Sequence, residues 1–245
     1  MRISRDDRVR TERAHVLAWP ALNTEVVDGW LWRSSGGGSQ RANSVSTVDF
    51  CGSDVEAAIA DVEARYQALG HPARFQTFDE TSPTGLADTL RRRGYAESEA
   101  TITMFKRVGM PGTPADVEVH DHAWAEWRIV YLGEITENRR EINALILDRV
   151  PTPRAFFGCR RDGEMIATAL GVVGFGCAVI ECVTTRADRR RRGAAQSVLM
   201  ALETWAAQQD AEWFGLQVVA SNTPAITLYE RLSFVAGATN CFWVR

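Results

Sequence analysis

The sequence predicts an α/β (α+β) fold built from two tandem units, each with a mixed, mostly antiparallel sheet flanked by helices. Two observations lead to this prediction. A segment rich in glycine and proline divides the chain near its middle, and the same order of strand-like and helix-like segments recurs on either side of it. The 245 residues are 45% hydrophobic and carry a formal net charge of −3. This composition excludes collagen-like, disordered and low-complexity chains.

The dividing segment is residues 108–115, whose sequence VGMPGTPA holds two glycines and two prolines in eight residues. Such a composition is typical of an exposed linker. We therefore expect a first unit at residues 1–108, a linker at 109–115 and a second unit at 116–245. Each unit then has the size of a small domain.

In the first unit, the pair Asp28-Gly29 predicts a hairpin turn between two apolar strands. A glycine-rich turn follows at residues 36–38, and an amphipathic helix is expected at 54–69. The helix leads to a strand at 74–75, then to a second helix and a closing strand. The unit is therefore a meander followed by helix, strand, helix and strand.

The second unit repeats this order. Its hairpin turn is expected at Asp162-Gly163, its glycine-rich turn at 174–176, its long helix at 193–209 and the following strand at 213–214. From the glycine-rich turn onward, the second copy follows the first at an offset of 138 or 139 residues. Because chance rarely preserves such spacing over several elements, we interpret the chain as a tandem repeat.

Neither a secretory signal nor a membrane-spanning segment is predicted. The N-terminal residues MRISRDDRVR carry charges from the second position onward and lack an apolar core. One membrane-like run, residues 165–180, carries no charge, but it is shorter than a spanning helix and is interrupted by glycines, so it is better explained as two strands. The five cysteines are scattered and form no CxxC pair. We therefore expect neither disulfides nor a zinc site, and a cytoplasmic location.

A basic loop stands between a predicted strand and a predicted helix of the second unit. Residues 177–185 (CAVIECVTT) alternate and are rich in β-branched side chains, as strands are. Residues 186–195 then read RADRRRRGAA. Free backbone N–H groups at a helix N-terminus bind anions, and small residues let a phosphate approach the main chain. The pattern favours a diphosphate site over a solvated basic face or a nucleic-acid patch.

Two motifs then resemble the GNAT superfamily of acyl-CoA-dependent N-acyltransferases. Residues 190–195 (RRRGAA) resemble that family's R/Q-x-x-G-x-G/A pyrophosphate loop. About 30 residues later, residues 216–222 (LQVVASN) and 225–234 (AITLYERLSF) are similar to its strand, asparagine, helix and L-Y-E-x-x-G-F sequence. The resemblance covers residues 154–245 directly, and the internal repeat extends it to the first half. The whole chain therefore resembles a tandem GNAT protein.

The resemblance implies an N-acetyltransferase that uses acetyl-CoA and no metal. Asn222 matches the asparagine beside the pantetheine arm, and it is equally expected to cap the helix that begins with Thr223-Pro224. Tyr229 matches the tyrosine that protonates the departing thiolate, with helix packing as the alternative role. The resemblance also implies the residues that would bind acetyl-CoA. The pantetheine arm would lie along the strand at Val183, Thr184 and Thr185. The diphosphate would lie on the loop formed by Arg190, Arg191, Arg192, Gly193, Ala194 and Ala195.

The general base is harder to identify. Some GNAT members carry a glutamate twelve residues before the tyrosine, where this chain has Gln217, which cannot accept the proton. Glu181 stands on the preceding strand, where other members use an acid, and we expect it to be the base. The alternatives are a solvated carboxylate at that position and an amine that loses its proton to water.

The first unit lacks the features of the coenzyme loop. At the corresponding place, residues 48–54 read VDFCGSD, and carboxylates facing a diphosphate would repel it. Residues 33–41 are glycine-rich, but no helix follows them at once, so a hairpin or bulge connection is the better interpretation. We therefore expect a degenerate copy that supports the second unit and walls the acceptor pocket.

Other candidate sites are weaker. His120 and His122 share the spacing of one strand face, yet no third metal ligand is evident. Trp124 and Trp127 are expected on a helix near the acceptor site, with a place in the core as their default role. A non-catalytic acyl-CoA-binding or regulatory module is the alternative function, because Gln217 replaces an acid and the first half is degenerate. We expect a small-molecule or peptide amine as acceptor, no nucleic-acid or membrane partner, and a monomer or homodimer.

Overall fold

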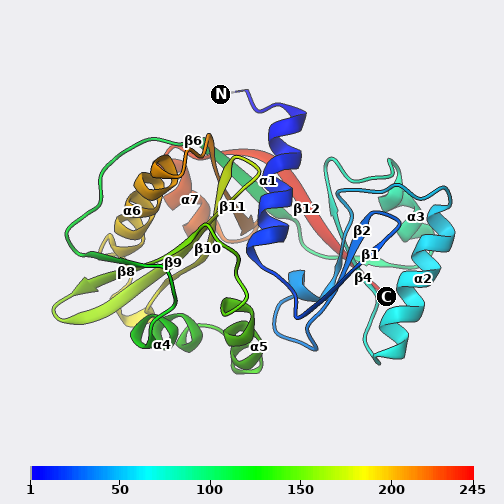
Figure 1. Ribbon diagram of the computed structural model, residues 1–245, viewed down its shortest axis with the longest axis horizontal. Coiled ribbons are helices and arrows are strands. Elements are labelled where there is room, and N and C mark those ends of the chain that lie inside the picture. The colour runs from blue at the N-terminus through cyan, green and yellow to red at the C-terminus, as the bar shows by residue number, and fades with distance from the viewer. Residues whose placement is uncertain (1) are drawn as a thin grey trace.

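A single sheet of twelve strands runs through the computed structural model, which describes residues 2–245 (Figure 1). Helices cover both of its faces. The strands are β1 (Asn23–Val27), β2 (Trp30–Ser34), β3 (Val45–Ser46), β4 (Arg74–Phe78), β5 (Ala96–Glu97), β6 (Thr101–Arg107), β7 (Val117–His120), β8 (Arg154–Arg161), β9 (Glu164–Gly174), β10 (Cys177–Thr185), β11 (Trp213–Val219) and β12 (Val235–Val244). The helices are α1 (Arg5–Ala18), α2 (Val55–Ala68), α3 (Leu86–Arg92), α4 (Ala125–Gly133), α5 (Glu137–Leu147), α6 (Ala194–Gln208) and α7 (Thr223–Arg231), with short 3₁₀ turns η1 (Arg41–Asn43) and η2 (Ala187–Arg189).

The mixed, mostly antiparallel character expected from the sequence is confirmed. Only the pairs β3–β4 and β10–β11 are parallel among the described strands, and every other pair is antiparallel. The predicted Asp-Gly hairpin turns join β1 to β2 and β8 to β9. The predicted glycine-rich turn at residues 174–176 joins β9 to β10.

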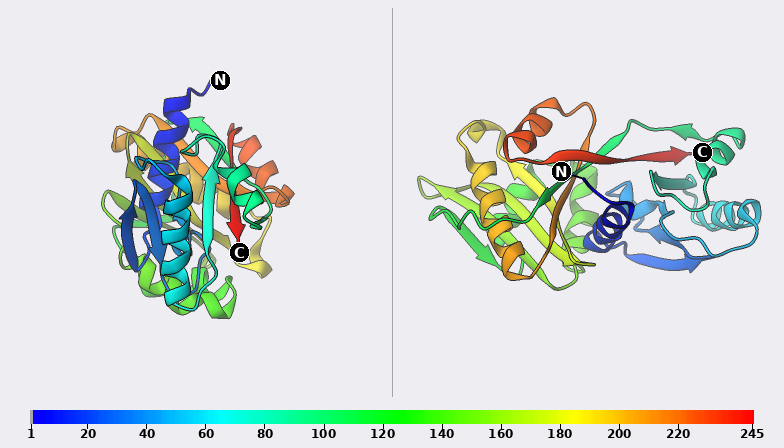
Figure 2. Two further views of the ribbon diagram at one scale, coloured as in Figure 1. Left: turned by 90° about the vertical axis from the view of Figure 1, so that its right-hand side faces the viewer. Right: turned by 90° about the horizontal axis from the view of Figure 1, so that it is seen from above.

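The prediction of two tandem units places one sheet in each half, and here the structure differs. The order is β1-β2-β3-β4-β12-β6-β11-β10-β9-β8-β7, so the closing strands of the two halves lie beside each other in the middle. β6 pairs with β11 of the second half, whereas β12 pairs with β4 of the first half. Figure 2 shows β12, in red, crossing from one side of the molecule to the other. Strand patterns specify a strand but not its partner, so the exchange is invisible in the sequence.

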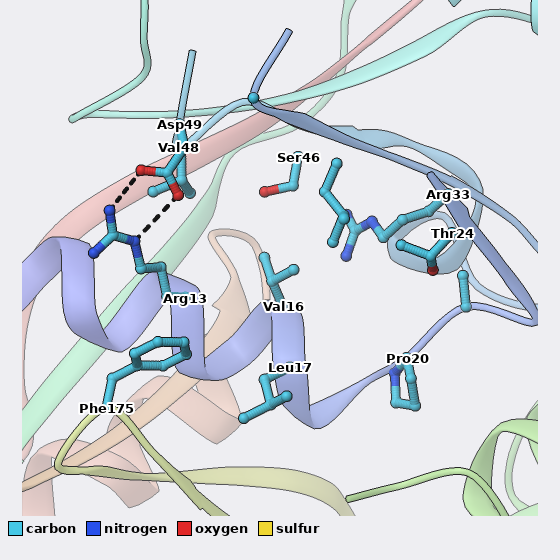
Figure 3. Close-up of a pocket in the computed structure, with 13 residues that line it drawn as sticks. Arg13, Val16, Leu17, Pro20, Thr24, Arg33, Ser46, Val48, Asp49 and Phe175 are labelled. Carbon is cyan, nitrogen blue, oxygen red and sulfur yellow. Dashed lines mark hydrogen bonds and ion pairs between the residues drawn. The ribbon is translucent and has the colours of Figure 1, made fainter. Parts of the chain in front are cut away.

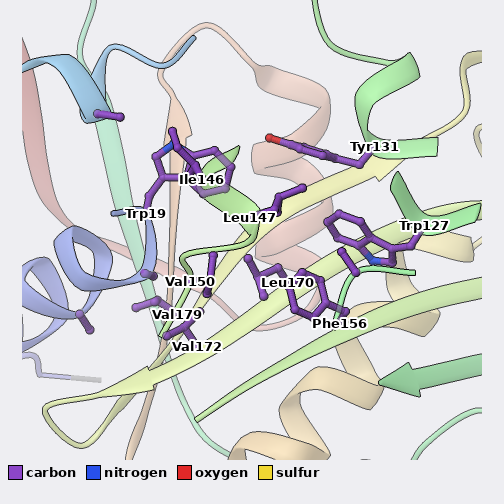
Figure 4. Close-up of a cluster of buried hydrophobic side chains, with 14 of the residues drawn as sticks. Trp19, Trp127, Tyr131, Ile146, Leu147, Val150, Phe156, Leu170, Val172 and Val179 are labelled. Carbon is purple, nitrogen blue, oxygen red and sulfur yellow. The ribbon is translucent and has the colours of Figure 1, made fainter. Parts of the chain in front are cut away.

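Alternating side chains of the second half feed two cores on opposite faces of the sheet. α1, α4 and α5 cover one face, where Trp127, Phe156 and Leu170 pack together (Figure 4). α6 and α7 cover the other face, which includes Phe157 and Tyr229. The core role of Trp127 is confirmed, since it is fully buried and its indole N–H donates a 3.0 Å hydrogen bond to the Phe157 carbonyl.

α1 is not among the elements predicted from the sequence. This helix begins with a capping box, in which the Asp7 backbone N–H donates to the Ser4 hydroxyl and the Ser4 backbone N–H donates to the Asp7 carboxylate. The Ser-x-x-Asp spacing was a usable signal, although the helix carries little apolar patterning. α1 packs against β9, β10 and β11 at the junction of the two halves (Figure 1). It therefore brings N-terminal side chains to the motif-bearing strands.

Candidate active site

A gap opens between β10 and β11 beside the predicted motifs. The two strands pair in parallel from Cys177 with Trp213 to Ile180 with Leu216, and the pairing ends there. Cys182 adopts a positive φ of 55°, and the register of β10 against β9 shifts between Glu181 and Thr184. Such a bulge bends a strand away from its neighbour. No strand therefore pairs with Val183, Thr184 and Thr185 on the β11 side of β10. The Thr185 carbonyl accepts a 3.4 Å hydrogen bond from the Arg190 guanidinium.

The predicted diphosphate loop has the geometry of an anion site. Gly193 has a φ of +79° and precedes α6, and no side chain caps this helix. Within the described chain, no backbone N–H of residues 190–196 donates a hydrogen bond to a protein atom. The Arg161 guanidinium donates to the Arg192 carbonyl and also to Asp116 at 2.9 Å, which braces the loop from β8. A row of free N–H groups at a helix N-terminus attracts an anion.

The arginines around this loop differ in whether they have an acidic partner. Arg186 and Arg189 form ion pairs with Glu164 and Asp188 on the surface, so they carry little free positive charge. Arg190, at the first position of the motif, lies 3.4 Å from a Glu134 carboxylate oxygen. Arg191 and Arg192 form no ion pair with an acidic residue in the part of the chain that the structure describes. Both guanidinium groups are therefore available to bind an anion.

Asn222 and Tyr229 lie at the two ends of the same short helix. The capping role of Asn222 is confirmed, because its side-chain oxygen accepts a 3.3 Å hydrogen bond from the Ala225 backbone N–H. Tyr229 is buried and packs edge-on against Phe234, with ring centroids 6.0 Å apart. Burial and the nearby Glu181 carboxylate raise the pKa of Tyr229 to about 12. The phenol thus keeps its proton at neutral pH.

Glu181 is buried in an ion-pair cluster that joins both halves of the chain. Its carboxylate accepts two hydrogen bonds from Arg41, at 2.7 and 2.5 Å, and lies 3.2 Å from the His15 Nδ1 atom. Although burial opposes ionisation, the Arg41 guanidinium lowers the pKa of Glu181 to about 2. The alternative of a solvated carboxylate is therefore wrong. A carboxylate with so low a pKa has little affinity for the proton of an amine.

A second buried carboxyl group stands next to Gln217. The Gln217 amide donates a 2.8 Å hydrogen bond to Glu12, which also accepts a 2.5 Å hydrogen bond from the Thr103 hydroxyl. Burial raises the pKa of Glu12 to about 8, and the two hydrogen bonds only partly oppose it. Glu12 comes from α1, 205 positions before Gln217, so no local sequence pattern places it beside the motif residue.

Glu181 and Gln217 face the α1 side of the sheet and line a cavity of about 400 Å³. Tyr229 belongs to the core on the opposite, α6–α7 side. The remaining walls come from the glycine-rich segment of the first half, from α5 and from β12. Gly38 must be small there, since a Cβ atom on it would lie 2.7 Å from Ile142 of α5. Residues 38–41 of the first half therefore line a cavity beside the motif strands.

A different cavity, of about 440 Å³, lies between α1 and the first-half strands (Figure 3). It is mostly apolar, and Arg13 and Asp49 form an ion pair at its edge, 2.5 Å apart. The residues that line it include none of the motif residues. We therefore place the candidate active site at the gap between β10 and β11.

The other candidates do not form a site. His120 and His122 meet edge to face, with ring centroids 5.7 Å apart. Residues 2–245 contain no cluster of three or more potential metal ligands. No helix in the same range is long and apolar enough to cross a membrane.

Comparison with known proteins gives related results at three levels. Residues 7–240 match the family described as "Probable histone acetyltransferase Rv0428c C-terminal". The chain is 30% identical over 241 residues to a Bacillus subtilis (strain 168) protein named "Uncharacterized N-acetyltransferase YobR", covering 94% of this chain and 95% of that one.

Solved structures share the fold. A GCN5-related N-acetyltransferase from Kribbella flavida is 18% identical with a TM-score of 0.72, and the match covers 98% of this chain and 96% of that one. A tandem GNAT protein from the clavulanic acid biosynthesis pathway is 14% identical with a TM-score of 0.62, covering 78% of this chain and 69% of that one.

Proposed function

This chain belongs to the Rv0428c C-terminal family of GNAT N-acetyltransferases, and from that premise we propose that it transfers an acetyl group from acetyl-CoA to a primary amine by direct attack. One observation carries the proposal. The gap between β10 and β11 has a protonated tyrosine on one face of the sheet and an ionised carboxylate on the other. A thioester in this gap could meet its acceptor from one side and a proton donor from the other.

We assign binding of the coenzyme A part of acetyl-CoA to residues of the second half. Free N–H groups of Arg191, Arg192, Gly193, Ala194 and Ala195 suit its diphosphate, with Arg190 beside them. The unpaired edge at Val183, Thr184 and Thr185 suits the pantetheine amides, which would add to β10 as an extra strand does. The Asn222 amide nitrogen, which its capping role leaves free, is assigned to the same arm.

In the proposed reaction, the neutral amine nitrogen attacks the thioester carbonyl carbon, and the carbon–sulfur bond breaks as the amide forms. The sulfur leaves as a thiolate and takes the proton of the Tyr229 hydroxyl. The attacking nitrogen loses one proton. Tyr229 regains its proton from solvent, so that the chemistry balances as amine plus thioester giving amide plus thiol.

Two carboxyl groups, one with a low pKa and one with a high pKa, take different roles toward the amine. Glu181 stays ionised, so we assign it mainly to accept a hydrogen bond from the amine and to orient it. Its role as the base that takes the amine proton is secondary. Glu12 has the proton affinity to serve as the final acceptor through a water molecule in the cavity. Release of the proton directly to solvent is the alternative for amines that are already neutral.

The tandem organisation is part of this proposal. Residues 1–108 are a degenerate GNAT-like copy, residues 109–115 a linker and residues 116–245 the catalytic unit. In the first half, Asp54 caps α2 through hydrogen bonds to the backbone N–H groups of Glu56 and Ala57. Because a carboxylate occupies the helix N-terminus that would hold a diphosphate, we expect one acetyl-CoA per chain.

The remaining expectations concern partners. Arg186 and Arg189 are neutralised by acids, which favours coenzyme binding over nucleic-acid binding at this loop. The acceptor is proposed to be a small-molecule or peptide amine, and the chain a cytoplasmic monomer or homodimer.

Thiol release from acetyl-CoA tests the function. With an amine panel of amino acids, polyamines, aminoglycosides and peptides, release that depends on one class of amine supports the transferase. Coenzyme A binding without release by any amine would instead support the alternative of a non-catalytic acyl-CoA-binding module.

A further inference from the structure

A buried chain of hydrogen bonds fixes one amide in the wall of the active-site cavity. Arg33 donates a 2.9 Å hydrogen bond to the Gln76 side-chain oxygen, which leaves the Gln76 nitrogen to donate to the Asn240 oxygen at 3.4 Å. All three side chains are almost fully buried. The orientation of the Asn240 amide is therefore set, because Gln76 can offer it only a donor.

The Asn240 Nδ2 atom has no hydrogen-bond partner, although it is buried and Asn240 lines the cavity. An unpaired buried N–H group costs about 1–3 kcal/mol and requires an explanation. A ligand in the cavity that accepts a hydrogen bond supplies one.

Arg139 of α5 lines the same cavity. Its Nε atom is buried without a partner, and within residues 2–245 no carboxylate forms an ion pair with its guanidinium. The other charged groups around the cavity largely cancel, since Arg41 and Glu181 neutralise each other. At neutral pH the raised pKa of about 8 also keeps Glu12 mostly uncharged. Arg139 therefore leaves the cavity with an excess positive charge.

We propose that the acceptor is a small amine that also bears a carboxylate, which binds Arg139 and the Asn240 amide while the amine faces Glu181 and Gln217. The guanidinium fork matches a carboxylate, and Asn240 adds a donor held at a fixed place. The inference rests on the proposed function and narrows its substrate class to amino acids, related amino carboxylates and short peptides with a free C-terminus.

The size and charge of the cavity also disfavour other amines. A volume of about 400 Å³ lies at the small end of the range for ligand sites, which accommodates an amino acid or a dipeptide. Polyamines and the basic tails of histones carry several cations and no nearby carboxylate. The unpaired Arg139 guanidinium repels them.

Matched acceptors that differ only in the carboxylate test the inference. Amino acids and dipeptides are compared with their C-terminal amides, which keep the amine and lose the negative charge. We expect kcat/KM for acetyl transfer to fall about 10- to 1000-fold on amidation. Equal or better turnover of the amides, of polyamines or of basic peptides would overturn the substrate class while leaving the transferase function intact.

Two variants of neighbouring arginines test the residue. Arg139→Gln should raise KM for the amino carboxylate at least tenfold, remove the preference for acid over amide and leave the KM for acetyl-CoA unchanged. Arg140→Gln is the matched control, because Arg140 is exposed on the same helix and does not line the cavity. An unchanged acid preference in Arg139→Gln would overturn the assignment.

Direct titration of the same acids and amides, with and without coenzyme A, gives a readout that needs no turnover. We expect the acids to bind more tightly than their amides, and Arg139→Gln to abolish the difference. If no amino carboxylate binds in preference to its amide, the inference fails, even where coenzyme A binds and the proposed function survives.

Discussion

The Gln217 side-chain amide donates a 2.8 Å hydrogen bond to the Glu12 carboxylate, which α1 brings from 205 positions earlier in the chain. Gln217 occupies the position at which some related transferases carry a glutamate. The chain therefore places a carboxyl group beside that position from a different segment. Because burial gives Glu12 a pKa of about 8, it titrates in the range where amines must lose a proton.

The first prediction concerns the pH dependence of acetyl transfer. If Glu12 receives the proton, kcat/KM should rise as pH increases through about 8, where the carboxyl ionises. Glu12→Gln should lower kcat/KM by roughly 10- to 1000-fold at pH 8 and remove this limb of the profile. If the dependence of kcat/KM on pH keeps its shape in Glu12→Gln, the amine proton goes to solvent and not to Glu12. Glu181→Gln serves as the comparison, since a group with a pKa of about 2 contributes no limb near pH 8.

The second prediction uses the stability of the same two variants. Glu12 has a folded-state pKa above its ordinary value of 4.5, so ionisation of the unfolded chain favours unfolding as pH rises from about 4.5 to 8. Glu12→Gln removes this penalty and should raise stability by about 1–3 kcal/mol at pH 7, with no gain at pH 4.

Glu181 should show the opposite sign. Its folded-state pKa lies below 4.5, so its ionised form stabilises the fold above that pH, and this contribution is lost as pH falls toward 2. Glu181→Gln should cost about 3 kcal/mol at pH 7, because the partly buried Arg41 is left without its acidic partner. Chemical denaturation between pH 3 and 8 measures both effects. Parallel pH profiles for the two variants would contradict the assigned charge states.

The third prediction concerns the coenzyme loop. Gly193→Asp places a side chain and a negative charge at a left-handed position where the diphosphate is proposed to meet the main chain. Titration calorimetry should give one coenzyme A per chain for the wild type, with affinity lowered at least 100-fold in the variant. Gly85→Asp is the matched control, because Gly85 has a φ of +85° and also precedes a helix, in the first half. Two equivalent sites, or retained affinity in Gly193→Asp, would place the coenzyme elsewhere.

The sequence could predict features whose causes are local. The strand, loop and helix around Gly193, and the cap at Asn222, each depend on residues within a few positions of one another, so pattern and propensity suffice. Arg41 and Glu181 meet across 140 positions, and Glu12 meets Gln217 across 205. Such pairs depend on how β6 and β12 exchange places and on where α1 docks. No periodicity in a single chain encodes that pairing.

The chemical step at Tyr229 tests the account most directly. Tyr229→Phe keeps the buried ring against Phe234 and removes only the hydroxyl, so folding and coenzyme A affinity should barely change. Single-turnover acetyl transfer should then slow by roughly 10²- to 10⁴-fold, because the departing sulfur lacks its proton donor. Tyr95→Phe, at a buried tyrosine bonded to Glu63 in the first half, should keep the wild-type rate. Full activity in Tyr229→Phe would contradict the account, because it would show that the departing sulfur does not take its proton from Tyr229 at the gap between β10 and β11.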